Sequence, residues 1–243
     1  TGMLREIRKK MVILKNHMPF TAELKSYLRQ IEQEEWLNSS MELEGSLLAK
    51  GQIQAIFAGE VCADVSIDEH IMVRRTGDLV PALWSFFSMK REPELNLVRE
   101  IAGVIYGGIP EYRKKTVMIS ELNYVPPHPA QIPEKMDELA ALFIKADEAE
   151  PQTEECFLSA AAIHDMIAEI VPYGERDRLL ARTAAAYYLI TRGYPLVTFC
   201  MREQDYNMMT EKYLKTGNHE ECAEELEKAV LKRLKLMTQL TRY

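Results

Sequence analysis

The stretch AAAIHDMIAEIVPYGERDRLLARTAAAYYLITRGYPLVT, residues 160–198, decides the fold that we expect. It holds two runs of small and apolar residues at helical spacing, separated by a short segment with proline and glycine. Gly193 and Pro195 close the second run in the order typical of a helix C-terminus. We therefore predict helices over 153–170 and 177–192, joined by a tight loop.

Helical spacing also dominates the chain on both sides of this stretch. A helix is predicted from Leu24 toward Leu37, and the polar run Asn38–Ser40 either interrupts it or starts another helix over about 38–50, with Ser40 as its cap. Further helices are predicted over 51–57, 79–88, 96–105, from 133 onward and over about 219–240.

One segment in the middle has a different pattern. Residues 116–119 are rich in β-branched side chains, a short polar turn follows, and Tyr124 and Val125 precede a proline-rich loop. We predict a short β-hairpin over 116–125. The predicted fold class is mainly α with this one hairpin, in a single domain over 1–243 whose core spans about 79–213.

Composition and charge exclude several classes of function. The chain has 243 residues, 47% of them hydrophobic, and a net charge of −7. The acidic balance argues against nucleic acid as a partner, and no apolar run is long enough to predict a membrane span. The four cysteines and five histidines are scattered, which argues against a zinc site and favours the cytoplasm.

The loop and the helix after it carry a family resemblance. Residues 171–182, VPYGERDRLLAR, resemble the signature HPFx(D/E)GNGRxxR of the Fic (Fido) family, and the family's Gly-Tyr-Pro follows at 193–195. Pro172, Tyr173, Glu175 and Arg182 fit that signature. The segments that agree with the family in chain order are 39–45, 111–113, 117–119, 124–127 and 132–136, so the resemblance covers about residues 24–240.

The resemblance implies a helical Fic domain that transfers AMP from ATP to a hydroxyl of a target protein. It implies that Glu175 holds Mg²⁺, and that the flap residues Val117, Met118 and Ile119 dock the target. It also implies that Ser40 and Glu44 belong to an inhibitory helix. Arg182 would pair with the nucleotide phosphate or with Glu44, and we expect a Glu44–Arg182 salt bridge.

The sequence departs from the signature where the chemistry is most demanding. Val171 stands at the position of the general base and cannot accept a proton. Arg176 and Arg178 replace glycines that let backbone N–H groups approach phosphate, and Leu179 replaces the first arginine. We therefore assign no catalytic residue and expect an impaired Fic-fold protein with a regulatory or protein-binding role.

Two alternatives stay open from the sequence. Arg176, Arg178 and Arg182 lie near a helix start and could form a reshaped phosphate site with Mg²⁺ on Glu175, which would make the chain a nucleotide sensor or transferase. The chain could also be a plain helical structural domain. His164 could replace the missing base, although packing inside the fold is the expected role. The sequence leaves the oligomeric state open.

Overall fold

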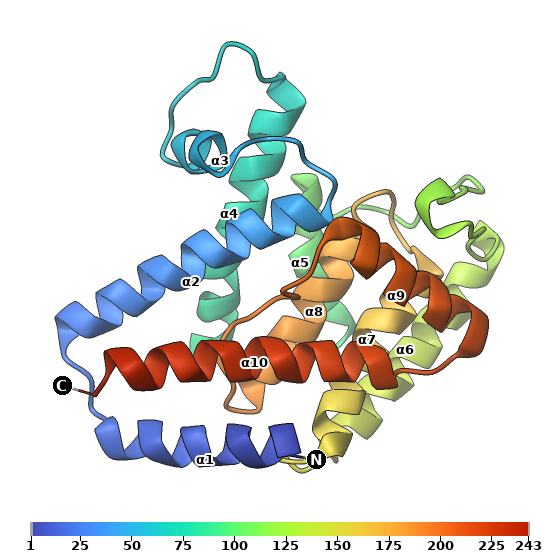
Figure 1. Ribbon diagram of the computed structural model, residues 1–243. Helices are drawn as coiled ribbons and strands as arrows, with labels where there is room; N and C mark the ends of the chain where they lie inside the picture. Colours follow the sequence, from blue (N-terminus) through green and yellow to red (C-terminus); the bar gives the residue numbers. More distant parts are fainter. Residues whose placement is uncertain (1, 243) are drawn as a thin grey trace.

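A computed structural model describes residues 2–242, which form ten α-helices and two short 3-10 helices (Figure 1). The bounds are α1 Gly2–His17, α2 Ala22–Leu43, α3 Lys50–Phe57, α4 Ile67–Ser88, α5 Leu95–Tyr106, η1 Ser120–Leu122, η2 Pro129–Gln131, α6 Ile132–Asp147, α7 Glu154–Ile170, α8 Asp177–Thr191, α9 Glu203–Thr216 and α10 Glu220–Leu240. The mainly α fold class predicted from the sequence is confirmed.

The two helices of the opening stretch, α7 and α8, form the centre of the fold. Nearly every residue of α8 is buried, and alanines recur along both helices, which lets their backbones approach closely. A helix that is apolar or small on all sides is stable only when other helices surround it. Accordingly, α6 and α10 pack on α7, while α4 and α5 pack on α8.

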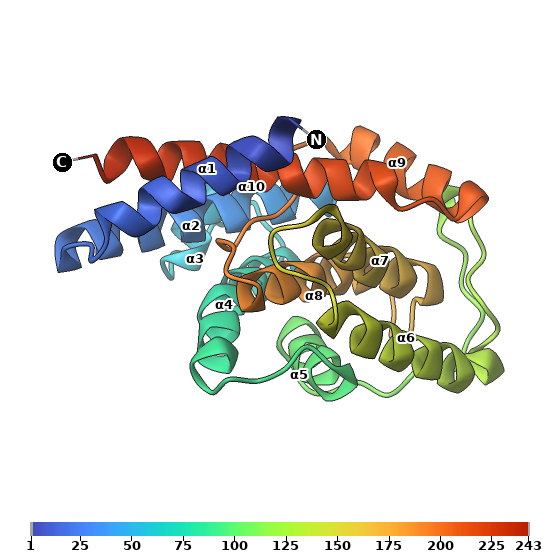
Figure 2. The ribbon, with the colours of Figure 1, turned by 90° about the horizontal axis from the view of Figure 1, so that it is seen from below.

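The two terminal helices cover one side of this centre. Figures 1 and 2 show α1 and α10 side by side and running in the same direction. Their ends are held together because His17 Nδ1 lies 2.8 Å from Thr241 Oγ1. On another side, α2 packs on α4 and α4 packs on α5. None of the helices in the described range is long and apolar enough to cross a membrane.

The N-terminal helix boundary predicted at Asn38–Ser40 is wrong. The structure has one unbroken helix, α2, from Ala22 to Leu43, and no separate helix over 38–50. Ser40 is fully buried inside α2, because Trp36 and Met41 pack into the core around it. This packing outweighs the modest preference of serine and asparagine for helix starts.

Helix α2 ends just before Gly45, the last residue of the family-like segment 39–45. Glu44 is the C-cap, and Gly45 has a φ of +82°, a left-handed conformation that glycine adopts without strain. The Ser46 N–H donates back to Met41 O at 3.0 Å and closes the turn. The end of α2 therefore fixes the position of the Glu44 side chain.

The hairpin predicted over 116–125 is reduced to one pair of residues. Ile119 and Tyr124 form an isolated antiparallel bridge, with Ile119 N donating to Tyr124 O at 2.8 Å and Tyr124 N donating to Ile119 O at 3.2 Å. The turn between them is η1. We call residues 116–125 the flap; its proline-rich exit prevents a longer ladder.

Candidate functional site

The loop between α7 and α8, residues 171–176, is the centre of the candidate site. Val171 ends α7 in a left-handed conformation, with a φ of +48° and a side chain that is only 3% exposed. A β-branched residue is strained there, since its Cβ crowds the following carbonyl. The surrounding packing therefore holds this turn in place.

Asp177, the first residue of α8, closes the loop from inside. One carboxylate oxygen, Oδ2, accepts hydrogen bonds from the backbone N–H groups of Tyr173 at 2.7 Å and Gly174 at 3.0 Å. The other, Oδ1, accepts from the Tyr106 hydroxyl at 2.7 Å. The Tyr106 oxygen in turn accepts from the Arg176 N–H at 3.0 Å. Three backbone donors of the loop are thus already satisfied.

Burial governs the protonation of this carboxylate. Asp177 is only 1% exposed, and its desolvation raises its pKa to about 6 against the lowering effect of its hydrogen bonds. The neighbouring Tyr106 hydroxyl has its pKa raised by burial first and by the Asp177 charge second. Tyr106 therefore keeps its hydroxyl proton, and the Asp177 carboxylate remains the hydrogen-bond acceptor for the loop.

Arg113 holds the opposite side of the same loop. Its side chain is buried, its Nε donates to Val171 O at 2.6 Å and its Nη2 donates to Ile170 O at 3.2 Å. The Arg113 backbone N–H donates to Pro172 O at 2.9 Å. The end of α7 and the loop are therefore fixed by a charge-assisted contact from the segment before the flap.

Arg182 and Glu44 form the ion pair expected from the sequence. Arg182 Nη2 donates to Glu44 Oε2 at 2.9 Å, and the two side chains are 1% and 12% exposed. The guanidinium also lies over the Tyr206 ring, 5.0 Å from its centroid. Two further donors of Arg182, Nε and Nη1, have no hydrogen-bond partner among residues 2–242.

Arg178 is used in a different contact from the phosphate contact of the alternative reading. Its Nη2 donates to Glu121 Oε1 at 2.8 Å, and its Nη1 donates to Asn207 Oδ1 at 2.5 Å. Arg178 therefore ties α8 to η1 in the flap and to α9. The Glu175 carboxylate, expected to hold Mg²⁺, is exposed.

Two cavities adjoin the loop and share Glu121, Glu175 and Arg178 in their walls. One, of about 370 Å³, lies under flap residues 117–119. The other, of about 350 Å³, lies beside the end of α2. The charged residues of the second are Glu44, Asp68, Glu69, Glu121, Glu175, Arg176 and Arg178. With five carboxylates and two guanidinium groups, this cavity disfavours anionic ligands.

A buried polar cluster lies on the other side of Arg182. His164 is fully buried, as expected for a packed residue; its Nε2 lies 2.5 Å from the Tyr206 hydroxyl and its Nδ1 lies 2.8 Å from Asp165 Oδ1. The fold also brings Cys222 next to them, so that ligand-type atoms of all three residues lie within 4.8 Å of one another. The scattered cysteines and histidines did not predict this cluster.

Sequence reasoning found the loop and the ion pair but missed the group that closes the loop. No site role is predicted for Asp177 from the sequence, and the structure buries it. Its place three residues after Gly174, at the first position of a helix, was a usable signal, because a carboxylate there can accept from the preceding N–H groups. Tyr106 and Arg113 gave no comparable local signal.

Comparisons with known proteins agree with this fold. The model of the Fic/DOC family matches residues 92–189. A Fic domain containing signaling protein from Bacteroides thetaiotaomicron is similar in structure, with a TM-score of 0.80, 18% identity and coverage of 98% of this chain and 97% of that chain. No curated protein matches the sequence.

Two further solved structures have the same fold. Fic-1 from C. elegans matches with a TM-score of 0.76, 18% identity and coverage of 98% of this chain and 71% of that one. A Fic family protein from Desulfovibrio desulfuricans matches with a TM-score of 0.62, 14% identity and coverage of 100% and 74%. The resemblance to the Fic family is therefore confirmed, and the fold is a Fic fold.

Proposed function

We propose that this Fic-fold chain does not transfer AMP and instead binds an extended segment of a partner protein along its flap. The observation that carries the first part is the closed loop 171–176, whose backbone donors are already bonded to Asp177 and Tyr106. The observation behind the second part is the open backbone edge of the flap.

The absence of a general base supports the loss of transfer. The Val171 side chain offers no lone pair, and removal of such a base lowers a rate by about 10²- to 10⁴-fold. His164 does not replace it, because both its ring nitrogens face Asp165 and Tyr206 in the interior. Neither residue therefore takes a proton from an incoming hydroxyl at the loop.

The residues present do not fit a nucleotide triphosphate with Mg²⁺. A phosphate at the loop would compete with the Asp177 carboxylate for the N–H groups of Tyr173 and Gly174. The two anions would also repel each other, because both would lie within hydrogen-bond distance of the same donors. The carboxylates of the adjoining cavities add to this repulsion. A single exposed carboxylate, Glu175, is a weak ligand set for a divalent ion.

The flap supplies a backbone edge that an extended peptide can pair with. Both backbone groups of Ile119 point to Tyr124, so those of the preceding residue, Met118, point to the opposite side. Within residues 2–242, Val117 and Met118 form no backbone hydrogen bond with another backbone group. The Met118 side chain is 62% exposed beside the 370 Å³ cavity. Strand addition at such an edge is a common mode of peptide recognition.

Nucleotide binding is the second candidate, favoured by one observation. The Nε and Nη1 donors of buried Arg182 have no hydrogen-bond partner among residues 2–242. Unsatisfied buried donors of this kind are expected where a protein binds an anion. In this reading Glu44 blocks the site, and its removal would expose the guanidinium. The two candidates therefore predict different results for the same variant.

Calorimetric titration of Mg²⁺–ATP tests both candidates. We expect no binding at millimolar nucleotide by the wild type, Glu44→Gly or Val171→His, because none of them removes Asp177 from the loop. Histidine tolerates the left-handed conformation of position 171 better than valine, so Val171→His should fold. Glu42→Gly, an exposed carboxylate on the same helix, is the matched control.

Saturable binding by Glu44→Gly would favour the second candidate. Labelled AMP transfer to any protein by the wild type would overturn the proposed loss of transfer, and transfer by Val171→His would show that the closed loop 171–176 does not exclude the nucleotide. Far-UV circular dichroism of each variant shows that it is folded.

A proline scan tests the flap. Peptides selected from a displayed random library on the wild type should bind about tenfold more weakly to Met118→Pro, because one edge N–H is lost and the proline ring obstructs pairing. Val117→Pro is the control, because Val117 is the neighbour of Met118 in the strand and its backbone N–H points away from the open edge. Selection of no peptide, or equal weakening by both variants, would contradict strand addition at this edge.

A further inference from the structure

Three residues with different metal-binding atoms meet in the interior between α7 and α10. His164 and Asp165 are neighbours on α7, Cys222 lies in the first turn of α10, and the two helices pack against each other. All three residues are buried, with exposed fractions of 0%, 1% and 2%. An imidazole nitrogen, a carboxylate oxygen and a sulfur lie within 4.8 Å of one another there. We call this set the α7–α10 cluster.

The distances within the α7–α10 cluster suit a single ion. His164 Nδ1 lies 2.8 Å from Asp165 Oδ1 and 3.6 Å from Cys222 Sγ. A tetrahedral zinc ion with ordinary bond lengths holds a nitrogen and a sulfur ligand about 3.6 Å apart, and a nitrogen and an oxygen ligand about 3.4 Å apart. The sulfur therefore already has the required separation from the nitrogen, and the carboxylate needs to move away from the ring by only about 0.6 Å.

Two further residues orient the ligand atoms. The other ring nitrogen of His164, Nε2, lies 2.5 Å from the Tyr206 hydroxyl, which fixes the direction of Nδ1. The second oxygen of Asp165, Oδ2, lies 2.7 Å from His219 Nδ1. Metal sites commonly have such a hydrogen-bond partner on the free nitrogen of a ligating histidine and on a ligating carboxylate. Tyr206 and His219 are therefore positioning residues, and His219, whose side chain is 32% exposed, lies on the solvent side of the cluster.

Charge and ligand type select the ion. A carboxylate and a deprotonated thiol carry two negative charges, which a divalent cation balances, so that the buried site has no net charge. Mg²⁺ and Ca²⁺ prefer oxygen ligands, whereas zinc binds nitrogen, sulfur and carboxylate oxygen. The sequence spacing argues against zinc, because Cys222 lies 58 positions from His164. The packing of α10 on α7 removes that objection, since it brings the ligand atoms together.

We propose that the α7–α10 cluster binds one zinc ion through His164 Nδ1, Asp165 Oδ1 and Cys222 Sγ, with a water as the fourth ligand. Binding releases the thiol proton of Cys222 to solvent and leaves the single ring proton of His164 on Nε2, facing the Tyr206 oxygen. The ion joins the start of α10 to the middle of α7. The proposal does not depend on the function proposed for the flap.

Binding of zinc and cobalt to the full chain tests this proposal. After treatment with EDTA, the reduced protein should bind one zinc ion per chain with a Kd of about 1 µM or less, measured by competition with a chromophoric chelator. Co²⁺ in its place should give a thiolate-to-metal charge-transfer band in the near ultraviolet. Zinc should also raise the urea midpoint of the wild type, because an ion bound by the folded chain stabilises it.

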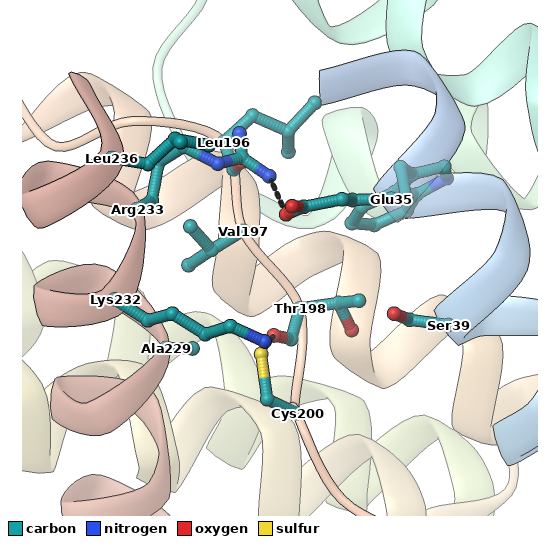
Figure 3. A pocket seen from close by; sticks show the side chains of 11 residues that line it. Glu35, Ser39, Leu196, Val197, Thr198, Cys200, Ala229, Lys232, Arg233 and Leu236 are labelled. Atoms are coloured by element: carbon teal, nitrogen blue, oxygen red, sulfur yellow. Dashed lines mark hydrogen bonds and ion pairs between the residues drawn. The ribbon is translucent and has the colours of Figure 1, made fainter. Parts of the chain in front are cut away.

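Three variants make the result specific to the cluster. Cys222→Ser should remove the charge-transfer band and weaken zinc binding by at least about 100-fold, since the sulfur ligand is lost. His219→Ala should keep the band and weaken zinc binding by about 10- to 100-fold, as loss of an outer contact does. Cys200→Ser is the control and should change neither. Figure 3 shows Cys200 in the wall of another cavity, which it shares with Lys232, a cation that repels a metal ion.

Several results would overturn the proposal. Zinc binding by the folded wild type only at millimolar concentration, or a cobalt spectrum without the charge-transfer band, would show that the cluster is a hydrogen-bonded network alone. Loss of the band in Cys200→Ser would place the ion elsewhere. His219→Ala changes a partly exposed side chain, so it tests the site even if Cys222→Ser does not fold. Equal zinc affinity of His219→Ala and the wild type would contradict the proposed arrangement.

Discussion

Replacement of Asp177 by alanine is expected to lower the free energy of unfolding by about 2–4 kcal/mol at pH 7. The substitution leaves three donors without their acceptor: the Tyr173 N–H, the Gly174 N–H and the Tyr106 hydroxyl. The loss is smaller than three full desolvation penalties, because alanine also removes a buried charge that the fold holds at a cost. Urea denaturation measures this change.

The pH dependence gives this prediction a sign. The folded pKa of Asp177, about 6, lies above the ordinary aspartate value of 3.8, so the folded state binds the proton more tightly. Stability from this group is therefore greatest below pH 4 and is lost as pH rises through 6, by up to about 3 kcal/mol. The difference between wild type and Asp177→Ala should accordingly grow between pH 7 and pH 5.

Tyr106→Phe is the control for the same contact. It leaves the Tyr173 and Gly174 N–H groups bonded to Asp177, removes the acceptor of the Arg176 N–H, and should cost only about 1–2 kcal/mol. In Asp177→Ala the freed N–H groups of the loop should also take up inorganic phosphate, which would raise the stability of the variant and not that of the wild type. A variant as stable as the wild type at pH 5, or one indifferent to phosphate, would contradict the role assigned to Asp177.

Removal of the Glu44 charge by Glu44→Gln is expected to lower the free energy of unfolding by about 3 kcal/mol. The Arg182 guanidinium is 1% exposed, so it would remain buried without its counter-charge. Replacement of both residues, with Arg182→Met, removes that unpaired charge, and the double variant should be more stable than the sum of the two single losses predicts. Urea denaturation of all four proteins completes the cycle.

A second ion pair of the chain supplies the comparison. Glu35 is 44% exposed in its contact with Arg233, and Glu35→Gln should cost under about 1 kcal/mol, since water screens this pair. Additive losses for Glu44 and Arg182 would show that the two residues are not coupled, and the pair would then have no structural role.

The sequence predicted the parts of the fold that are determined by local chemistry. The ends of α7 and α8 follow from Thr153, which caps α7, and from Gly193, which allows the chain to turn after α8. The Glu44–Arg182 contact was predicted from the family resemblance. Glu44 lies in the segment that resembles the inhibitory helix and Arg182 in the segment that resembles the signature, and the resemblance implies that these two residues pair.

Other features depend on tertiary packing and could not be predicted from the sequence. The continuity of α2 through Asn38–Ser40 depends on burial of Trp36 and Met41 against helices far away in the chain. Arg113 reaches the loop across 58 positions of sequence, so no local pattern marks it. The flap kept the predicted turn but only one bridge, because the prolines after Val125 end the pairing.

The left-handed conformation of Val171 has a consequence for protein engineering. A backbone with a φ of +48° suits glycine, asparagine or histidine better than it suits valine. Substitution of Val171 by any of these three residues relieves backbone strain, which stabilises the fold. It also removes two buried methyl groups, which destabilises the fold, so the two contributions to the free energy of unfolding oppose each other. The backbone at this position already has a conformation that histidine adopts more readily than valine, so a designer who replaces Val171 and Asp177 together starts from a suitable main chain.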